Sequence, residues 1–333
     1  MSAAGSVSKS WLALIAGVVI GAASCGGSSA VEHTRLPAEQ PPPAGICGTS
    51  TAPPARFDHV IVIVLENHSY NQLVGAGTAR STPYLNQLAG RCGLATDYHS
   101  ITHPSLPNYL AITGGSTFGF TTDCRCQVRA PSIFSQVAAG GGSWAVYAES
   151  MPRPCQSTDS LGVYYAAHHN PPIFYRGLAA ACPASDRPLG TPTRGPLATA
   201  LRSGRLARYV FIAPDRCHDM HDCSVTVGDA WVSWWVNAIV RSRVYRDQST
   251  VVFITVDEGT GGHIGKGENC AANPTDQSCH VPLIVVSRYV PAGTRDRAGL
   301  DHYSLMRATA QLTGTAPLGH ALTAPDLLAA FHL

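Results

Sequence analysis

Short apolar runs rich in β-branched residues alternate along the chain with stretches in which apolar residues recur at helical spacing. Near-continuous apolar runs are typical of strands buried on both faces of a sheet, and intervening helices supply the crossovers of a parallel sheet. The predicted strands are residues 59–65, 144–148, 209–213, 251–256 and 281–286. The predicted helices are residues 83–89, 106–112, 132–138, 225–240 and 304–312. The pattern therefore predicts an α/β fold with a mostly parallel sheet that is covered on both faces.

The first 25 residues have the layout of an export signal. Lys9 precedes an apolar run, residues 11–23, that is too short for a comfortable transmembrane span. Small residues immediately before Cys25 resemble a bacterial lipobox, in which this cysteine becomes the acylated first residue of the mature chain; plain secretion is the alternative. We therefore expect an exported protein, either a cell-envelope lipoprotein held at the membrane by Cys25 or an extracellular protein.

Composition divides the rest of the chain. Residues 26–54 are rich in Pro, Gly, Ser and Ala, as is typical of a flexible tether, and residues 55–333 are expected to form one domain. Within it, residues 124–193 are rich in Pro, Cys and Tyr and are expected to form an irregular insertion. The chain is 45% hydrophobic and 13% charged, which indicates a globular protein. We expect a monomer.

Net charge and cysteine usage limit which partners and which cellular compartment are expected. A net charge of +2, with 23 basic residues scattered rather than gathered in a stripe, argues against a nucleic-acid partner. Ten of the 11 cysteines follow Cys25, and an even count in an exported chain predicts up to five disulfides. Cys217 with Cys223 and Cys270 with Cys279 are plausible local pairs, and the full pairing stays open.

Oxygen-bearing side chains follow two of the predicted strands. Glu66 and Asn67 come directly after the first strand, and Asp257 and Glu258 come directly after the fourth. Ligands of open α/β sheets bind beyond the carboxyl ends of the strands. Three carboxylates in one crevice repel one another unless a cation lies between them. We therefore expect a divalent metal ion there; ordinary turns at the two strand ends are the structural alternative.

Ser105 is a candidate nucleophile at the start of the predicted helix 106–112. A serine in this position is ordinarily a helix cap. Free backbone N–H groups and the helix dipole also favour an anion there, and a hydroxyl beside a metal ion is placed to attack phosphorus. Asn108, one turn on, is expected to donate to a phosphoryl oxygen.

One histidine is expected to protonate the leaving alkoxide, a role that suits a side chain titrating near neutrality. The candidates are His103, His221 and His302, and for each of them a supporting role beside the reacting groups is the alternative.

Five ordered motifs carry a resemblance to a known family. They are LENHSY, HPSLPNYLAITGG, DMHDCSVTVGDAW, TVDEG and HVPLIVVS. Over about residues 59–319 they resemble the bacterial phosphoesterase family, which contains acid phosphatases and phospholipase C enzymes within the alkaline phosphatase superfamily. The resemblance implies a three-layer α/β/α sandwich of alkaline-phosphatase type and a nucleophile that forms a phospho-enzyme.

The resemblance also implies roles for single residues. Glu66, Asn67, Asp257 and Glu258 become the ligands of one metal ion, with Ser105 as the nucleophile and a further ligand. This set of oxygen ligands suits a hard cation such as Ca²⁺, Mg²⁺ or Mn²⁺.

A weaker resemblance concerns a second metal ion. More distant nucleotide pyrophosphatase/phosphodiesterases carry a Thr-Phe-Pro-Asn segment, which is similar to residues 105–108, and a Pro-Asp-x-x-Gly-His segment, which is similar to residues 214–218. This resemblance implies a second site formed by Asp215, His218 and His280, whose nitrogen ligands shift the choice of metal toward zinc or iron. Whether the chain holds one metal ion or two stays open.

The sequence therefore predicts a secreted or lipid-anchored, metal-dependent phosphoric ester hydrolase. We expect an acid-phosphatase-like phosphomonoesterase that forms a phosphoserine, because a chain of 333 residues leaves no obvious room for the extra domains of larger phospholipases. Phospholipase C or another phosphodiesterase is the alternative, so the substrate is a small phosphate ester or a phospholipid. A catalytically silent surface binding protein on the same fold is the alternative of another class.

Overall fold

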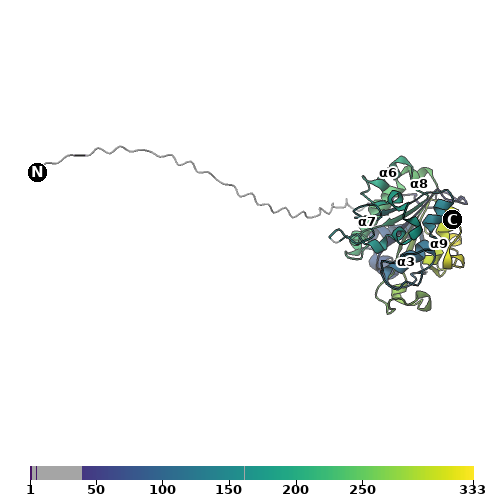
Figure 1. The fold of residues 1–333 in the computed structure, drawn as a ribbon. Helices are drawn as coiled ribbons and strands as arrows, with labels where there is room; N and C mark the ends of the chain where they lie inside the picture. The colour runs from purple at the N-terminus through teal and green to yellow at the C-terminus, as the bar shows by residue number, and fades with distance from the viewer. Residues whose placement is uncertain (2–4, 6–39, 161) are drawn as a thin grey trace. The chain divides into compact units, whose positions relative to one another are not determined.

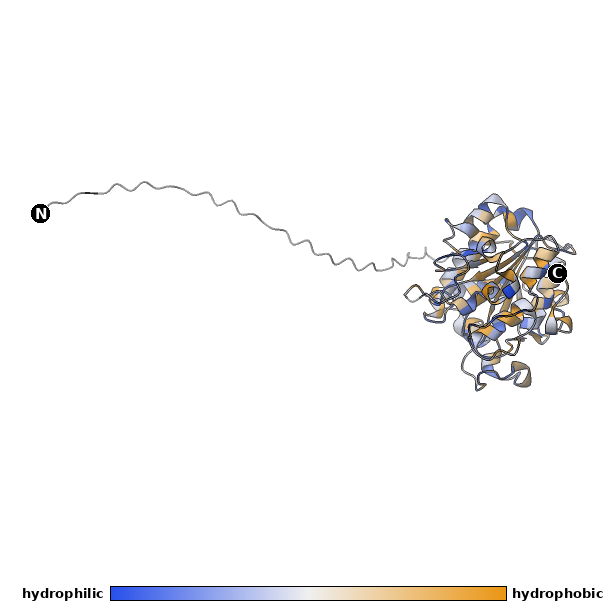
Figure 2. Ribbon diagram, viewed as in Figure 1, coloured by the Kyte–Doolittle hydropathy of each residue, from blue (hydrophilic) through white to orange (hydrophobic). Residues whose placement is uncertain are grey.

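Unbroken runs of apolar residues form the middle of the structure. β1 (His59–Leu65), β6 (Tyr209–Ala213) and β7 (Thr250–Val256) are neighbours in a central sheet, and every one of their residues is buried. Such β-branched and aromatic side chains pack well on a pleated surface that is covered on both faces. Figure 2 shows hydrophobic residues along the central strands.

The computed structural model describes residues 1, 5, 40–160 and 162–333 (Figure 1). Across these residues, eight strands form the sheet in the order β5-β4-β6-β1-β7-β8-β2-β9. All neighbouring pairs are parallel except the two that involve β8. The remaining strands of this sheet are β2 (Gly93–Ala95), β4 (Trp144–Ala148), β5 (Asp186–Pro188), β8 (Leu283–Val286) and β9 (Arg295–Asp296). A separate two-stranded sheet pairs β3 (Tyr98–His99) with β10 (Leu300–Asp301).

Helices cover both faces of the sheet. Figure 1 shows α6, α7 and α8 on one side and α3 and α9 on the other. The helices are α1 (Tyr70–Leu73), α2 (Pro83–Arg91), α3 (Ser105–Gly114), α4 (Ile133–Ala139), α5 (Cys182–Ser185), α6 (Pro196–Ser203), α7 (Val225–Val240), α8 (Arg243–Asp247), α9 (His302–Thr313) and α10 (Leu327–Phe331). The prediction of an α/β fold with a mostly parallel sheet is confirmed. No helix within the described ranges is long and apolar enough to span a membrane.

The range expected to form an irregular insertion, residues 124–193, is only partly irregular. It contains α4 and two strands of the sheet, β4 and β5, which pair with each other in parallel. Between these strands the chain forms short helical turns, including η2 (Ala167–His169) and η3 (Pro171–Phe174). The irregular part is therefore an excursion that leaves the sheet after β4 and returns to it at β5.

The predicted signal peptide, apart from Met1 and Gly5, lies outside the described residues, and so does Cys25 of the predicted lipobox. The tether expected over residues 26–54 is described from Gln40 onward. There the backbone C=O of Gln40 accepts a hydrogen bond from Asn237 Nδ2 on α7 (2.9 Å). The first described residues of this range are therefore bound to the domain.

Residues further along the same segment are held at one edge of the sheet. A disulfide joins Cys47 to Cys92, and the N–H of Thr49 donates to the C=O of Arg288 (2.9 Å). Arg288 follows β8, which runs against the parallel strands, so this contact lies at the edge formed by the amino ends of those strands. Composition alone predicts a flexible tether here, because composition does not show which cysteine pairs with Cys47.

Five disulfides link the cysteines of the described residues. They are Cys47–Cys92, Cys124–Cys126, Cys155–Cys182, Cys217–Cys223 and Cys270–Cys279. Both local pairs that the sequence suggests are among them.

Candidate active site

The pairing of β1 with β7 brings the two predicted strand ends together. Leu65 and Val256 are partners in this parallel pair, so Glu66 and Asp257 leave the sheet side by side. The N–H of Asn67 donates to Asp257 Oδ1 (3.2 Å). Asn67 has a φ of 46°, a left-handed conformation that Asn tolerates better than most residues, and it turns the chain directly after the strand.

The first turn of α3 adds the predicted nucleophile to this edge. Ser105 Oγ donates to Glu66 Oε2 (3.0 Å), and the Tyr109 hydroxyl, one turn on, donates to Glu66 Oε1. Ser105 is only 5% exposed, and the side chain of Glu66 is fully buried. Glu66 is therefore fixed by two hydroxyl groups from one face of the helix.

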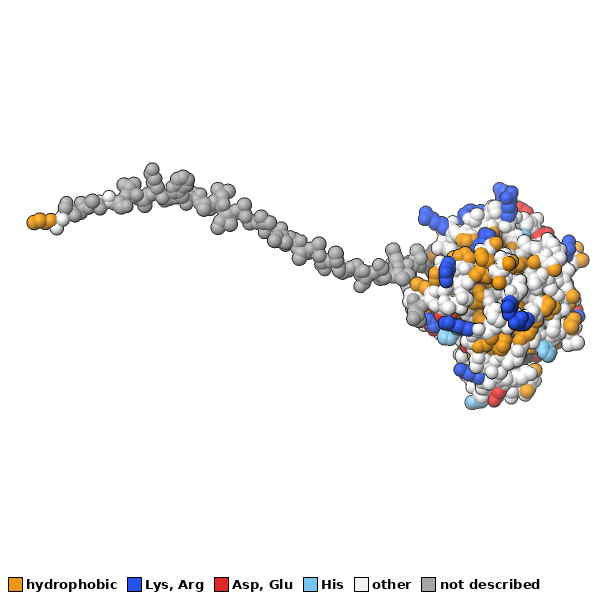
Figure 3. Space-filling model, in the orientation of Figure 1, with side chains coloured by type: hydrophobic (Ala, Val, Ile, Leu, Met, Phe, Trp, Pro, Cys, Tyr) orange, Lys and Arg blue, Asp and Glu red, His pale blue; other side chains and the backbone are white. Residues whose placement is uncertain are grey.

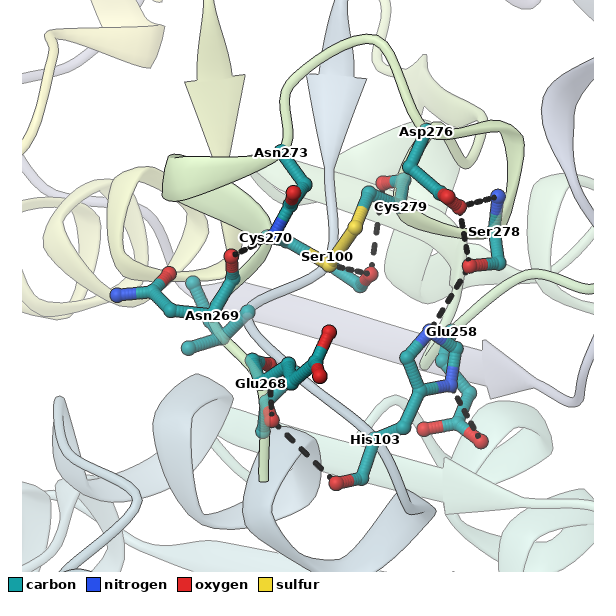
Figure 4. Close-up of a disulfide and its surroundings, with 12 residues drawn as sticks. Ser100, His103, Glu258, Glu268, Asn269, Cys270, Asn273, Asp276, Ser278 and Cys279 are labelled. Atoms are coloured by element: carbon teal, nitrogen blue, oxygen red, sulfur yellow. Dashed lines mark hydrogen bonds and ion pairs between the residues drawn. A yellow bond between two sulfur atoms is a disulfide. The ribbon is translucent and has the colours of Figure 1, made fainter. Parts of the chain in front are cut away.

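His103 links Glu258 to a loop that carries a disulfide (Figure 4). His103 Nδ1 lies 3.2 Å from Glu258 Oε1, and its Nε2 lies 3.2 Å from Ser278 Oγ. Ser278 Oγ in turn donates to Asp276 Oδ1 (2.6 Å), and the Cys270–Cys279 disulfide closes the loop around them. His103 is thus held between the predicted metal ligand and a polar pair nearer the surface.

Asn108 holds the loop that precedes the nucleophile. Its Oδ1 accepts hydrogen bonds from the N–H groups of Ile101 (3.0 Å) and Thr102 (3.2 Å). Its Nδ2 donates to the C=O of Thr102 (2.7 Å) and to Glu258 Oε2 (3.2 Å). The Asn108 side chain therefore contacts Glu258 and the loop, and its predicted contact with a phosphoryl oxygen stays a prediction.

Three carboxylates meet in this buried crevice with too little positive charge around them. Burial, followed by the charges of neighbouring carboxylates, raises the pKa of Glu66 and of Asp257 well above the usual range. Burial also raises the pKa of Glu258 well above its ordinary value. Asp257 Oδ2 is buried and has no hydrogen-bond partner among the described residues. An unpartnered oxygen among crowded carboxylates fits a bound hard cation.

His169 and Asp219 extend the site and were not predicted. His169 Nε2 lies 3.3 Å from Glu66 Oε1, its Nδ1 lies 3.2 Å from Asp219 Oδ2, and all three side chains are buried. The imidazole ring stacks on Tyr109, with ring centres 5.3 Å apart. Burial lowers the pKa of His169 to about 3, so the ring is neutral at physiological pH. For His169 the only signal in the sequence is the pair of adjacent histidines, which stands inside the range predicted to be irregular. Asp219 begins the motif DMHDCSVTVGDAW, but no role was predicted for it.

The predicted second metal site is not assembled as the sequence implies. Asp215 and His218 do lie together, with His218 Nδ1 3.3 Å from Asp215 Oδ1, but their third neighbour is Glu149, whose Oε2 is 3.0 Å from the same nitrogen. His280 is instead stacked on Tyr70, and its Nε2 contacts the C=O of Thr96 (3.0 Å). Glu149 follows β4 and Asp215 follows β6, so adjacent strands bring these carboxylates together.

The remaining candidate histidines occupy different environments. His302 is fully buried, with Nδ1 2.8 Å from the Tyr98 hydroxyl and Nε2 2.6 Å from the backbone C=O of Asp257. Both ring nitrogens are therefore engaged, Nδ1 with Tyr98 and Nε2 with the backbone of Asp257. His221 lies in the loop between β6 and α7, where its Nδ1 is 2.6 Å from Asp222 Oδ1 and its side chain is 41% exposed.

Curated proteins that are similar to this chain in sequence include phosphatases. A phosphatidylinositol-3-phosphatase of Mycobacterium tuberculosis (strain ATCC 25618 / H37Rv) is 26% identical over 274 residues, which cover 81% of this chain and 82% of that enzyme. A phosphate-repressible acid phosphatase of Penicillium chrysogenum is 27% identical over 274 residues, which cover 79% of this chain and 60% of that enzyme.

Solved structures show the fold, and a family profile shows the family. A protein in the alkaline phosphatase superfamily from Vibrio parahaemolyticus aligns over 90% of this chain and 76% of its own, with a TM-score of 0.54 and 11% identity, which confirms the predicted fold. A 2-O GAG sulfatase aligns over 83% of this chain and 74% of its own, with a TM-score of 0.54 and 11% identity. Residues 77–314 match the profile of the Phosphoesterase family. The chain therefore belongs to the Phosphoesterase family and is a hydrolase of phosphoric esters, as its motifs predict.

Proposed function

We propose that this protein is a metal-dependent phosphomonoesterase of the acid phosphatase type that acts through a phosphoserine at Ser105. The observation that carries the proposal is the 3.0 Å hydrogen bond from Ser105 Oγ to Glu66 Oε2, at the start of a helix and beside a buried cluster of carboxylates. The relatives named as an acid phosphatase and as a phosphatidylinositol-3-phosphatase support hydrolysis of a monoester.

The residues of the chain supply attack, charge stabilisation and protonation. Ser105 Oγ attacks phosphorus, forming an O–P bond while the bond from phosphorus to the alkoxide breaks, and Glu66 Oε2 is placed to receive the hydroxyl proton. Backbone N–H groups at the start of α3 stabilise the added negative charge. His221 is the proposed donor to the leaving alkoxide, because it is more exposed than the buried His302. Water then attacks phosphorus as the bond from phosphorus to Ser105 Oγ breaks, and inorganic phosphate leaves. Ser105 recovers its proton from Glu66, and His221 recovers one from the attacking water.

One divalent metal ion is part of this proposal. Glu66, Asn67, Ser105, Asp257 and Glu258 would hold it, and their oxygen atoms favour Mg²⁺, Mn²⁺ or Ca²⁺ over Zn²⁺. When bound, the ion supplies positive charge that favours the serine alkoxide and offsets the charge of the phosphoryl oxygens.

Replacement of the nucleophile tests the proposal. We expect Ser105→Ala to reduce hydrolysis of p-nitrophenyl phosphate by at least about a thousandfold, because the covalent route is lost. Ser203→Ala, at the exposed end of α6, is the matched control and should hydrolyse the ester at the wild-type rate. Full activity of Ser105→Ala would rule out the phosphoserine route.

Substrate comparison separates the alternatives. We expect p-nitrophenyl phosphate to be hydrolysed faster than bis-p-nitrophenyl phosphate and phosphatidylcholine; the reverse order would favour a phosphodiesterase or a phospholipase C. Elemental analysis should find one equivalent of metal, and chelation should abolish turnover. Two equivalents would indicate a second ion, for which Glu149, Asp215 and His218, or Glu66, His169 and Asp219, are the candidate ligands. The absence of both metal and turnover would favour a silent binding protein.

We also propose that the protein is exported, by secretion or as a lipoprotein acylated at Cys25. The five disulfides support an oxidising compartment. Radiolabelled palmitate should label the wild-type protein and not Cys25→Ala if the chain is lipid-anchored, and should label neither if it is secreted.

A further inference from the structure

The start of α3 already carries an anion from elsewhere in the chain. Pro104 precedes the helix, and its side chain makes no capping hydrogen bond. The N–H of Leu106 instead donates to Oδ1 of Asp123 (2.9 Å), a residue that lies 17 positions further along. Asp123 therefore caps α3 from the loop that follows the helix.

This contact lies where the proposed function places the phosphoryl group. Leu106 is the residue directly after Ser105, and free N–H groups at the first turn of a helix bind phosphate oxygens and carboxylate oxygens for the same reason. Burial and then the charge of Asp123 raise the pKa of Glu258, so the Asp123 carboxylate also acts electrostatically on a proposed metal ligand.

The nucleophile is almost completely buried in this arrangement. Ser105 is only 5% exposed, and Glu66 and Asp257 beside it are fully buried. Asp123, in contrast, is exposed to solvent and lines a cavity of about 260 Å³, which is also lined by Arg125 and His168. The carboxylate thus contacts the helix start and also faces a cavity that is open to solvent.

We propose that the Asp123 carboxylate occupies the place at the start of α3 where the phosphoryl group of the substrate binds, and that this phosphoryl group displaces it. This inference rests on the proposed function and adds a residue that sets the affinity of the site for phosphate. The exchange needs no covalent step: the N–H of Leu106 releases one anionic oxygen and donates to another. The loop around the Cys124–Cys126 disulfide then moves with Asp123.

Competitive inhibition by inorganic phosphate tests the proposal. Asp123→Asn keeps an oxygen that can accept from Leu106 but removes the charge, so we expect the inhibition constant of phosphate and the KM of p-nitrophenyl phosphate to fall about fivefold. Asp326→Asn is the matched control, because Asp326 caps α10 through the N–H of Leu328 (3.0 Å), and both constants should stay at the wild-type value.

The possible outcomes separate this inference from the proposed function. If the wild-type enzyme turns over and Asp123→Asn leaves the inhibition constant unchanged or raises it, Asp123 is a structural cap and the inference is wrong. If neither protein hydrolyses p-nitrophenyl phosphate nor binds phosphate by calorimetry, the proposed function fails together with it. Should Asp123→Asn not fold, Asp123→Ser replaces it, since a serine hydroxyl also accepts hydrogen bonds at helix starts.

Discussion

Glu66 and Asp257 are held in surroundings that favour their neutral forms. Because burial and neighbouring carboxylates raise their pKa values, the folded protein retains protons that the unfolded chain releases as the pH rises above the ordinary range of a carboxyl group. The contribution of these groups to stability is therefore most favourable at acidic pH and declines as the pH approaches neutrality. The proposed metal ion would replace these protons and would remove this decline.

We therefore expect the chelated protein to unfold at a lower temperature at pH 7.5 than at pH 5.5, with a much smaller difference when metal is bound. Calorimetry at the two pH values, with and without chelator, measures this difference. Asp257→Asn should reduce the pH dependence of the chelated protein, and Asp247→Asn, on the exposed end of α8, should not. A chelated protein that is equally stable at both pH values would contradict the expectation.

His218 has the opposite behaviour. Burial by itself lowers the pKa of this histidine, but hydrogen bonds to Asp215 and Glu149 outweigh burial and raise it to about 10. Its contribution to stability is complete below the ordinary pKa of histidine and is lost as the pH rises through about 10. We expect the ring proton resonance of His218 in NMR spectra to titrate near pH 10 in the wild-type protein and to be absent from His218→Gln.

A titration of His218 near its ordinary pKa, or a shift on addition of zinc, would show that the ring is neutral and available as a metal ligand. The structure favours the charged ring, since a protonated imidazole between Glu149 and Asp215 already neutralises part of this cluster.

At the scale of elements, the turn after β7 depends on a glycine. A Cβ atom at Gly259 would lie 2.4 Å from Ser69 Oγ and 2.9 Å from the backbone C=O of Ser278, which accepts the N–H of Gly259 itself. The turn cannot accept a side chain without moving, and Asp257 and Glu258 immediately precede it. The close approach thus explains why the acidic pair is followed by glycine.

We expect Gly259→Ala to weaken metal binding by about 10–100-fold, the range seen when the support of metal ligands is disturbed. Isothermal titration with Mn²⁺ measures the affinity. Gly77→Ala is the control, because no atom lies within 4 Å of a Cβ built at Gly77, and its affinity should equal that of the wild type. Equal affinities for both variants would show that the turn relaxes without disturbing the ligands.

The longer elements could be predicted from the sequence because burial on both faces demands unbroken apolar runs. β2 and β5 could not, since they are three residues long and include Gly93 and Pro188, so their strand form depends on pairing with neighbours. Glu66 and Asp257 could be predicted because each directly follows a strong strand. His169 comes from an excursion without periodic pattern, and no sequence spacing relates it to Glu66.

At the scale of the whole molecule, the disulfide between Cys47 and Cys92 ties the described N-terminal segment to the end of α2. It closes the longest loop of the five disulfides, with a sequence separation of 45 residues. Chain-entropy arguments give such a loop a stabilisation of up to about 4 kcal/mol.

We therefore expect the double variant Cys47→Ala, Cys92→Ala to lose up to about 4 kcal/mol of unfolding free energy in urea titrations while retaining the kcat of the wild type. The catalytic rate should not change, because Thr49 and its neighbours contact the sheet edge opposite Ser105. A large fall in kcat with unchanged stability would show that the segment acts on the active site.

The first described residues of the domain and the proposed active site lie at opposite edges of the sheet. Gln40 is bonded near the end of α7, and Thr49 near the end of β8, whereas Ser105 and Glu66 lie at the carboxyl edge of the parallel strands. A bulky group attached at Gln40 or Thr49 should therefore leave the access of an ester to Ser105 unchanged, because it lies at the opposite edge of the sheet.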